Sequence, residues 1–176
     1  MILRFSCGVV LAGLLNLTAT GQTTDEYRLK AAFLYNFKKF VDWPSQAFKS
    51  PTDPLLICIL GKNPFGDLVY EAVSGKVVQG RTFSVRQMPD VAQAKGCHIL
   101  FVSGSERKHL AAILEAVEGS GVLTVGETEG FTNDGGVINF RIEGDHIQLH
   151  INVGAAVKQQ LGISPKLLSL AELVRK

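Results

Sequence analysis

The sequence predicts an α/β fold of the Rossmann-like or flavodoxin-like kind: a mostly parallel sheet flanked by helices, with an antiparallel hairpin towards the C-terminus. Short, continuous apolar runs, which are typical of strands buried on both faces, alternate along the chain with segments of helical periodicity. After residue 130 the apolar residues instead recur at every second position. That alternation is the pattern of antiparallel strands with one solvated face.

Composition limits the size of the fold and the class of partner. The chain has 176 residues, of which 46% are apolar, enough for one compact domain with a full-sized core. Its 18 lysines and arginines against 16 acidic residues leave a formal net charge of +2. Because this surplus is too small to neutralise a nucleic-acid backbone, we expect no nucleic-acid partner.

The first 21 residues have the three-part layout of a secretory signal peptide. Arg4 supplies a positive charge, the 13 residues 5–17 are almost wholly apolar, and small residues follow in 18–21. A membrane anchor is the alternative, but this run falls short of the roughly 20 residues that a bilayer requires. Cys7 lies early in the run and not at its end, where lipid attachment needs a cysteine. We predict export to the periplasm, cleavage near Ala19 or Gly21, and one α/β domain over 22–176 without stable membrane insertion.

The elements of the mature chain are expected in the following order. Thr24 or Asp25 should cap a first helix that ends by Trp43, because Pro44 disfavours helical backbone in the residue before it. Strands are expected at 55–60, 81–86, 98–102 and 122–125. Helices are expected from Asn63-Pro64 onwards, with Asn63 as the cap, and over 89–94 and 106–117.

The hairpin is predicted in detail. A two-residue turn at Gly144-Asp145 suits a type II′ geometry, because glycine tolerates a positive φ at the first position. This register pairs apolar residues on one face: Ile142 with Ile147, Phe140 with Leu149, and Ile138 with Ile151. Asn152 should cap a helix over 153–161, and Ser164-Pro165 should open a last helix that runs to about residue 174.

Removal of the leader leaves two cysteines, Cys58 and Cys97. In an oxidising compartment such a pair favours a disulfide. Cys58 lies in the first strand of the expected sheet and Cys97 directly before the third, and these strands are neighbours in the usual doubly wound order. A redox-active pair generally has Cys-x-x-Cys spacing at a helix start, which this pair lacks. We therefore predict a structural disulfide.

The sequence indicates neither a metal site nor a cofactor site. His146 and His150 share one face of the hairpin, but four residues along a strand separate them by about 13 Å, so we interpret that face as solvated. His98 and His109 have no cysteine, histidine or carboxylate at the spacing of a zinc site. Residues 61–66 lack the Gly-Lys-Ser/Thr ending of a phosphate loop, and no strand is followed by Gly-x-Gly-x-x-Gly.

Polar residues follow three of the predicted strands. Asn63, Ser103 and Glu127 should lie at the carboxyl edge of the sheet, where open α/β sheets bind ligands. They form a candidate ligand rim, although helix capping explains the same residues. Ser103 and Ser105 have no histidine or lysine that the sequence places beside them, and no pair of carboxylates is singled out. We therefore predict that the protein is not an enzyme.

Several segments resemble the YfiR family of exported bacterial proteins, and they occur in the expected order. They are residues 29–44 (LKAAFLYNFKKFVDWP), 97–102 (CHILFV), 123–126 (LTVG), 135–140 (GGVINF), 151–152 (IN) and 164–168 (SPKLL). The resemblance implies a noncatalytic periplasmic regulator, which binds the sensor region of an inner-membrane diguanylate cyclase and holds the enzyme inactive. An outer-membrane lipoprotein would relieve this repression, and the output would be cytoplasmic cyclic di-GMP.

The family also bears on the cysteines. The resemblance supports the Cys58–Cys97 bridge. Some members carry a second cysteine pair around the glycine-rich approach to the hairpin, whereas residues 132–139 contain no cysteine here. We therefore expect no second bridge and no redox control tied to one.

A regulator of this kind must bind the inactive arrangement of its target more tightly than the active one. Its binding surface should present exposed apolar or aromatic side chains. Trp43 and Phe48, just after the first helix, are the candidate contact residues; alternatively, Trp43 packs the helix end onto the sheet. A second functional hypothesis is a periplasmic small-ligand binding protein or enzyme that uses the rim of Asn63, Ser103 and Glu127.

Overall fold

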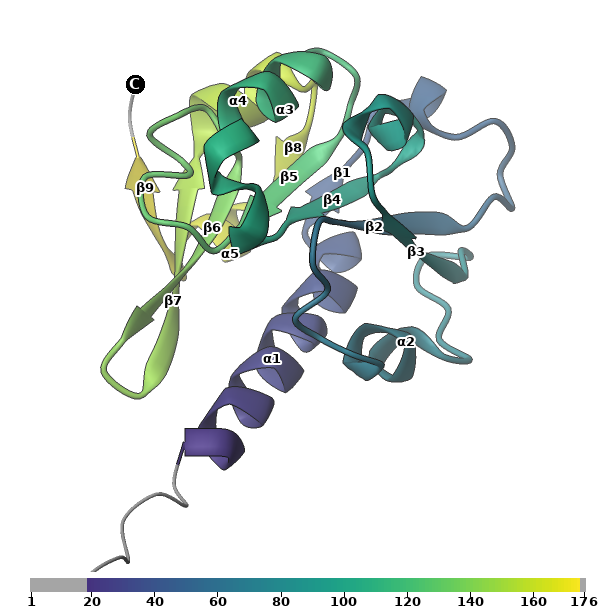
Figure 1. Cartoon of the computed structure of the whole chain (residues 1–176). Helices are drawn as coiled ribbons and strands as arrows, with labels where there is room; N and C mark the ends of the chain where they lie inside the picture. Colours follow the sequence, from purple (N-terminus) through teal and green to yellow (C-terminus); the bar gives the residue numbers. More distant parts are fainter. Residues whose placement is uncertain (1–18, 175–176) are drawn as a thin grey trace, which may run out of the picture.

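A seven-stranded sheet forms the centre of the computed structural model, which describes residues 19–174 and their side chains from residue 24 (Figure 1). Its strands lie in the order β3-β2-β4-β5-β6-β7-β9. Their bounds are β2 Leu55–Leu60, β3 Phe83–Met88, β4 Ile99–Val102, β5 Leu123–Gly126, β6 Ile138–Glu143, β7 His146–Asn152 and β9 Ala171–Val174. A second sheet pairs β1 Val41–Asp42 with β8 Gly162–Ile163. The predicted signal peptide falls mainly on residues 1–18, which lie outside the described part.

The strand pairing confirms the predicted α/β class. From β3 to β6 all neighbours are parallel, and β2 lies between β3 and β4 as in the flavodoxin-like order. β7 then runs antiparallel to β6, and β9 runs parallel to β7. Strands from the parallel half and from the hairpin thus belong to one continuous sheet.

Helices cover both faces of this sheet (Figure 1). The α-helices are α1 Ala19–Asn36, α2 Leu68–Val73, α3 Leu110–Ala116, α4 Val153–Lys158 and α5 Pro165–Leu168. Four short 3-10 helices add η1 Phe37–Lys39, η2 Ser45–Ala47, η3 Val91–Gly96 and η4 Gly104–His109 within the described residues. Alternate residues of one strand serve the two faces: Ile57 and Ile59 pack towards α1 and α2, whereas Cys58 and Leu60 pack towards α3 and η3.

The hairpin has the predicted register. Ile142 lies opposite Ile147, Phe140 opposite Leu149, and Ile138 opposite Ile151. Gly144 has φ +65°, as the first position of a type II′ turn requires. Asn152 also caps α4 as expected, because its Oδ1 accepts the N–H of Ala155 at 2.8 Å.

The first helix begins earlier than predicted and ends, as predicted, before Trp43. α1 begins at Ala19, so Thr24 and Asp25 lie inside it and do not cap it. The α-helix ends at Asn36, followed by one 3-10 turn, and the residues before Trp43 form strand β1. β1 pairs with β8, which lies about 120 residues further along the chain. Because the two strands are so far apart in sequence, no local pattern predicts that these residues form a strand.

Two expected helices begin elsewhere or in another form. Asn63 does not cap a helix at Pro64; its Oδ1 accepts the N–H of Phe65 at 2.9 Å and its Nδ2 donates to the carbonyl of Gly66 at 3.0 Å. This side-chain turn competes with helical backbone, so α2 starts only at Leu68. The short helix expected over 89–94 is the 3-10 helix η3, displaced towards the C-terminus.

The C-terminal segment is the clearest error in the predicted elements. A helix from Pro165 to about residue 174 was expected, but α5 ends at Leu168 and Ala171–Val174 form β9. Hairpin strand β7 leaves one edge unpaired, and β9 supplies the missing hydrogen bonds. In this segment, strand pairing with the open edge of β7 is therefore more favourable than the helix that the spacing of the apolar residues predicts.

No helix in the described residues is long and apolar enough to cross a bilayer.

Candidate functional site

The loops at the carboxyl ends of the parallel strands contact one another. The backbone N–H of Lys62 donates to Ser105 Oγ at 3.0 Å, which joins the loop after β2 to the loop after β4. Gly104 and Glu127 line the same cavity, which brings in the loop after β5. The strand ends therefore meet as the sequence implied.

The three rim residues do not converge on one cavity. Asn63 stabilises its own loop, as described above. Ser103 is buried, and its Oγ accepts the N–H of Ser105 at 3.4 Å at the start of η4. Glu127 lines a cavity to which the other two do not contribute. Its lining residues are Glu26, Tyr27, Lys30, Gly104, Glu127, Thr128, Glu129, Asn139, Phe140, Arg141 and Ile142.

Glu127 holds a buried lysine from α1. The side chain of Lys30 is only 3% exposed, and its Nζ lies 2.7 Å from Glu127 Oε2 and in contact with the carboxylate of Glu26. The hydroxyl of Tyr27 donates to Glu127 at 3.2 Å. Burial, together with the charge of Glu127, raises the pKa of Tyr27 well above its ordinary value, so this hydroxyl keeps its proton. The cluster docks α1 onto the end of β5.

Sequence reasoning found Glu127 but missed Lys30 and Tyr27. The available signal was the spacing of Glu26 and Lys30, since residues four apart face each other on a helix. Nothing local indicated that this pair would lie against the sheet.

The cavity beside this cluster has a volume of about 600 Å³, and Asn139 is one of its lining residues. Asn139 donates through Nδ2 to the carbonyl of Thr128 at 2.9 Å, but its buried Oδ1 has no hydrogen-bond partner. Because this oxygen is buried, it is not accessible to a molecule in the cavity.

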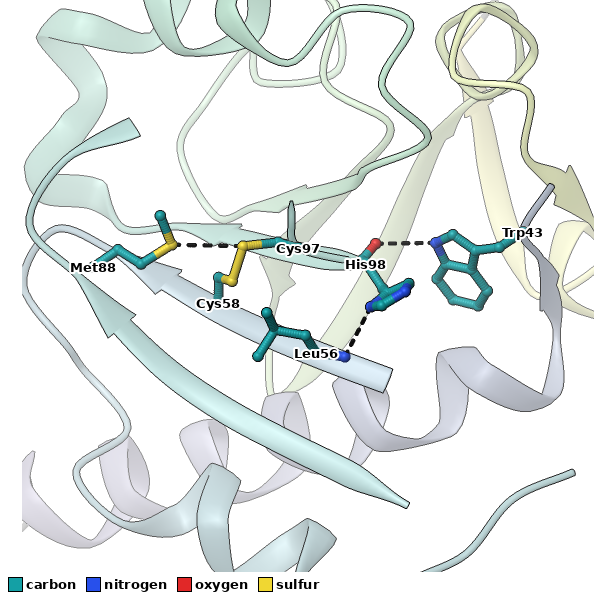
Figure 2. Close-up of a disulfide and its surroundings, with 6 residues drawn as sticks. All are labelled: Trp43, Leu56, Cys58, Met88, Cys97 and His98. Atoms are coloured by element: carbon teal, nitrogen blue, oxygen red, sulfur yellow. Dashed lines mark hydrogen bonds between the residues drawn. A yellow bond between two sulfur atoms is a disulfide. The ribbon is translucent and has the colours of Figure 1, made fainter. Parts of the chain in front are cut away.

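A disulfide joins Cys58, in the middle of β2, to Cys97, two residues before β4 (Figure 2). The two Cα atoms lie 6.0 Å apart, and both residues are buried, which places the predicted bridge inside the core. Met88 Sδ lies 3.5 Å from Cys97 Sγ. Because thiols in solution cannot reach a buried bridge, its surroundings favour a structural role.

His98 follows the bridge and has a defined protonation state. The backbone N–H of Leu56 donates to Nδ1 at 2.9 Å (Figure 2), so the proton of the neutral ring lies on Nε2, which donates to the carbonyl of Ala47 at 3.0 Å. Burial lowers the pKa of His98. The ring therefore acts as a neutral structural link between β2, β4 and η2.

Both predicted contact residues pack around His98. The indole N–H of Trp43 donates to the carbonyl of His98 at 3.1 Å, and Trp43 also packs against the main core (Figure 2). The ring of Phe48 stacks on His98 with centroids 4.2 Å apart, and the guanidinium of Arg81 lies 3.7 Å from the Phe48 centroid. Each side chain is half-buried, and their contact with a partner stays a prediction.

A more exposed apolar surface, missed by sequence reasoning, lies between α1 and the hairpin tip, which project from the same side of the sheet (Figure 1). Leu29 is 46% exposed and Ile142 is 51% exposed. Both line a groove of about 200 Å³ that also contains Ile147 and Asp25. The periodicity placed Leu29 in the buried stripe of its helix, but α1 buries the neighbouring residues Lys30 and Ala31, and Leu29 lies beside that buried face. We call this groove, with Leu29 and Ile142 as its exposed apolar residues, the α1–hairpin groove.

The interpretation of His150 as part of a solvated face is wrong. His150 is only 9% exposed, and its ring lies near two carboxylates, Glu143 on β6 and Glu172 on β9. The ligand atoms of the three residues all lie within 4.8 Å of one another, so they could hold a metal ion together. Glu172 belongs to the unpredicted strand β9, so no local pattern indicates that it lies near His150.

Comparison with known proteins identifies the family. A family model described as DUF4154, YfiR/HmsC-like, matches residues 27–172. The chain belongs to the YfiR/HmsC-like family. The match extends from α1 to β9 and confirms the resemblance seen in the sequence. No curated protein matches the sequence.

Solved structures agree with the fold of this YfiR/HmsC-like chain. A conserved domain protein from Vibrio cholerae O1 biovar El Tor aligns with a TM-score of 0.59 at 9% identity over 85% of this chain. An ABC domain in complex with L-Trp from Streptococcus pneumoniae aligns with a TM-score of 0.51 at 11% identity over 68% of it. The chain spans 60% and 55% of the lengths of those proteins. At these identities the likeness concerns the fold alone.

Family membership indicates what kind of protein this is. The YfiR/HmsC-like family is periplasmic and regulatory rather than catalytic, and membership suggests a regulatory role in cyclic di-GMP signalling.

Proposed function

We propose that this YfiR/HmsC-like protein is a noncatalytic periplasmic repressor that binds the sensor region of an inner-membrane diguanylate cyclase, and that an outer-membrane lipoprotein relieves the repression. The family match over 27–172 supports the class of function. The structural observation that carries the proposal is the α1–hairpin groove, where Leu29 and Ile142 remain about half exposed on two elements that face each other.

Exposed apolar side chains at a groove favour a protein partner. If a partner covers the exposed halves of Leu29 and Ile142, each side chain contributes about 1 kcal/mol to the free energy of binding. Asp25, Glu26 and Asp145 line the same groove and supply a polar rim, as protein interfaces have around an apolar centre. A sensor surface with an apolar side chain and basic neighbours would complement this groove in shape and charge.

The surface of Trp43 and Phe48 is a second contact candidate. It lies beside His98 at the amino end of β4, whereas the α1–hairpin groove lies beyond the carboxyl end of the parallel strands. Because the two surfaces are at opposite ends of the sheet, substitutions at one leave the other intact. Separate variants therefore distinguish the two interfaces.

The test measures repression and binding in cells that lack the chromosomal gene. L29A/I142A is expected to raise cyclic di-GMP and to abolish co-purification of a membrane cyclase after cross-linking of the envelope, without a change in Tm. V157A/L170A is the matched control, since Val157 and Leu170 are exposed apolar residues outside the groove. If L29A/I142A represses and co-purifies like the parent protein, this surface is not the interface.

A small-ligand function at the carboxyl edge is the second candidate, and the cavity lined by Lys30, Glu127 and Asn139 favours it. Native mass spectrometry of the purified protein tests it. A retained small molecule that is lost in N139L would support the binding function, and a bare protein of the expected mass would count against it.

A further inference from the structure

Three adjacent strands place one histidine and two glutamates on the same face of the sheet. His150 of β7 lies directly opposite Glu172 of β9, and its Nε2 is 3.3 Å from Glu172 Oε2. Glu143, at the end of β6, approaches from the other side, with its Oε1 3.7 Å from the same Nε2. Imidazole nitrogen and carboxylate oxygen are ligand types that divalent transition metals bind in proteins.

The state of the imidazole distinguishes this cluster from a group of surface charges. Nε2 of His150 is buried and has no hydrogen-bond partner, although two carboxylates lie within 4 Å of it. Buried polar nitrogens in proteins are nearly always bonded to something. The two carboxylates also bring a formal charge of −2 to this position, which a dication would balance.

We propose that Glu143, His150 and Glu172 bind a divalent transition-metal cation, with Zn²⁺ as the representative ion. Donor atoms in a tetrahedral zinc site lie about 3.4 Å apart, given metal–ligand bonds near 2.1 Å. The two distances from Nε2, 3.3 and 3.7 Å, are already close to that separation. The side chains of Glu143 and Glu172 are 45% and 62% exposed, so they can rotate to complete the geometry.

The ligand set selects among cations. Mg²⁺ and Ca²⁺ prefer sites made wholly of oxygen, so the imidazole favours Zn²⁺ and its neighbours in the transition series. Three protein ligands leave a further position for water or for a donor from another molecule. Because Glu172 lies on the edge strand β9, the cation would tie the end of the chain to the hairpin.

The experiment is a Zn²⁺ titration of the purified, untagged protein after treatment with a chelator. We expect one Zn²⁺ per chain by isothermal titration calorimetry and a rise in Tm of about 5–10 °C when free Zn²⁺ is one hundred times its Kd. Loss of a residue that only hydrogen-bonds to a metal ligand lowers metal affinity by roughly 10–100-fold. H150A removes a ligand itself and should therefore lower the affinity for Zn²⁺ by more than that. E143Q and E172Q keep the side-chain shape and should weaken binding as well.

The controls separate this site from adventitious binding by exposed histidines. H109A and H146A remove histidines whose side chains are 69% and 67% exposed, and both should bind Zn²⁺ like the parent protein. Mg²⁺ at the same concentration should not raise the Tm. A parent protein that takes up no Zn²⁺, or H150A, E143Q and E172Q variants that bind it unchanged, would overturn the proposal in favour of a simple His–Glu ion pair.

Discussion

The indole nitrogen of Trp43 donates a hydrogen bond to the backbone carbonyl of His98, 3.1 Å away. This contact fastens the segment after α1 to the residue that follows the disulfide cysteine Cys97. The side chain thus contributes to folding whether or not it also contacts a partner.

Substitution of Trp43 should reveal that contribution. W43A is expected to lower the free energy of unfolding by about 2–3 kcal/mol, because a half-buried indole loses its packing and its hydrogen bond. W43F keeps an aromatic ring but loses the indole N–H, so it should lower the free energy of unfolding by about 1 kcal/mol. Urea denaturation measures both values. A W43F variant that is nearly as stable as the parent protein but no longer represses the cyclase would show that Trp43 is also a partner contact.

Loss of the disulfide should have a larger effect. Cys58 and Cys97 are 39 residues apart, and the chain-entropy model for a loop of that size gives about 4 kcal/mol of stabilisation. C58A/C97A should therefore unfold at markedly lower urea concentration than the oxidised parent protein. Unfolding with and without reductant is the matched comparison, since reductant should not change the stability of the variant. A difference below about 1 kcal/mol would contradict the structural role.

Stability should fall in mildly acidic solution because of His98. Its folded pKa is lowered, mainly by burial, so the unfolded chain binds the proton more readily than the folded protein does. The stabilisation is complete above the unfolded pKa of about 6.5 and is lost as the pH falls below it, by at most about 1.4 kcal/mol per pH unit. Arg81, Lys38 and Asp53 face the ring, and the two cations oppose its protonation.

The variant H98N tests this assignment, because its amide oxygen can accept the N–H of Leu56 without titrating. Its free energy of unfolding should depend less on pH between 7 and 5 than that of the parent protein. H146A removes an exposed histidine and should keep the parent's pH dependence. Parallel pH profiles for H98N and the parent protein would show that another group is responsible.

The Lys30–Glu127 pair should be sensitive to loss of one member. K30M leaves Glu127 without its main cation, although the Glu127 side chain is only 13% exposed. The free energy of unfolding should therefore fall by about 3–5 kcal/mol. K30M/E127Q removes both charges and should recover part of that loss. A double-mutant cycle with E127Q, measured by thermal unfolding, isolates the coupling between the two side chains. Purely additive effects would show that the two charges do not stabilise each other.

Much of the fold could be predicted because its determinants are local. The apolar run 55–60 formed β2 with the expected bounds, and the alternation on both sides of Gly144 set the hairpin register. The order of β2 and β4 followed from the doubly wound topology and brought the two cysteines together. Asn152 capped its helix because capping involves only neighbouring residues.

The candidate sites were harder to predict because they depend on long-range pairing. Glu127 was recognised from its position after a strand, but its partner Lys30 lies 97 residues away on α1. Leu29 fitted a buried stripe and is nevertheless half exposed, because α1 buries the neighbouring residues Lys30 and Ala31 instead. The sequence pattern predicts a helix at Glu172, so it does not indicate that Glu172 approaches His150.

By itself, the sequence determined the α/β class, the parallel order of the first strands, the hairpin, the disulfide pair and the family, because periodicity, spacing and short motifs are properties of neighbouring residues. The tertiary structure decided which side chains meet: the buried lysine at the sheet edge, the α1–hairpin groove, and the histidine between two glutamates. These depend on the unpaired edge of β7 and on which face of α1 packs against the sheet. Which side chains are buried, and which strand pairs with an open sheet edge, depends on the packing of distant segments, so no local sequence pattern predicts them.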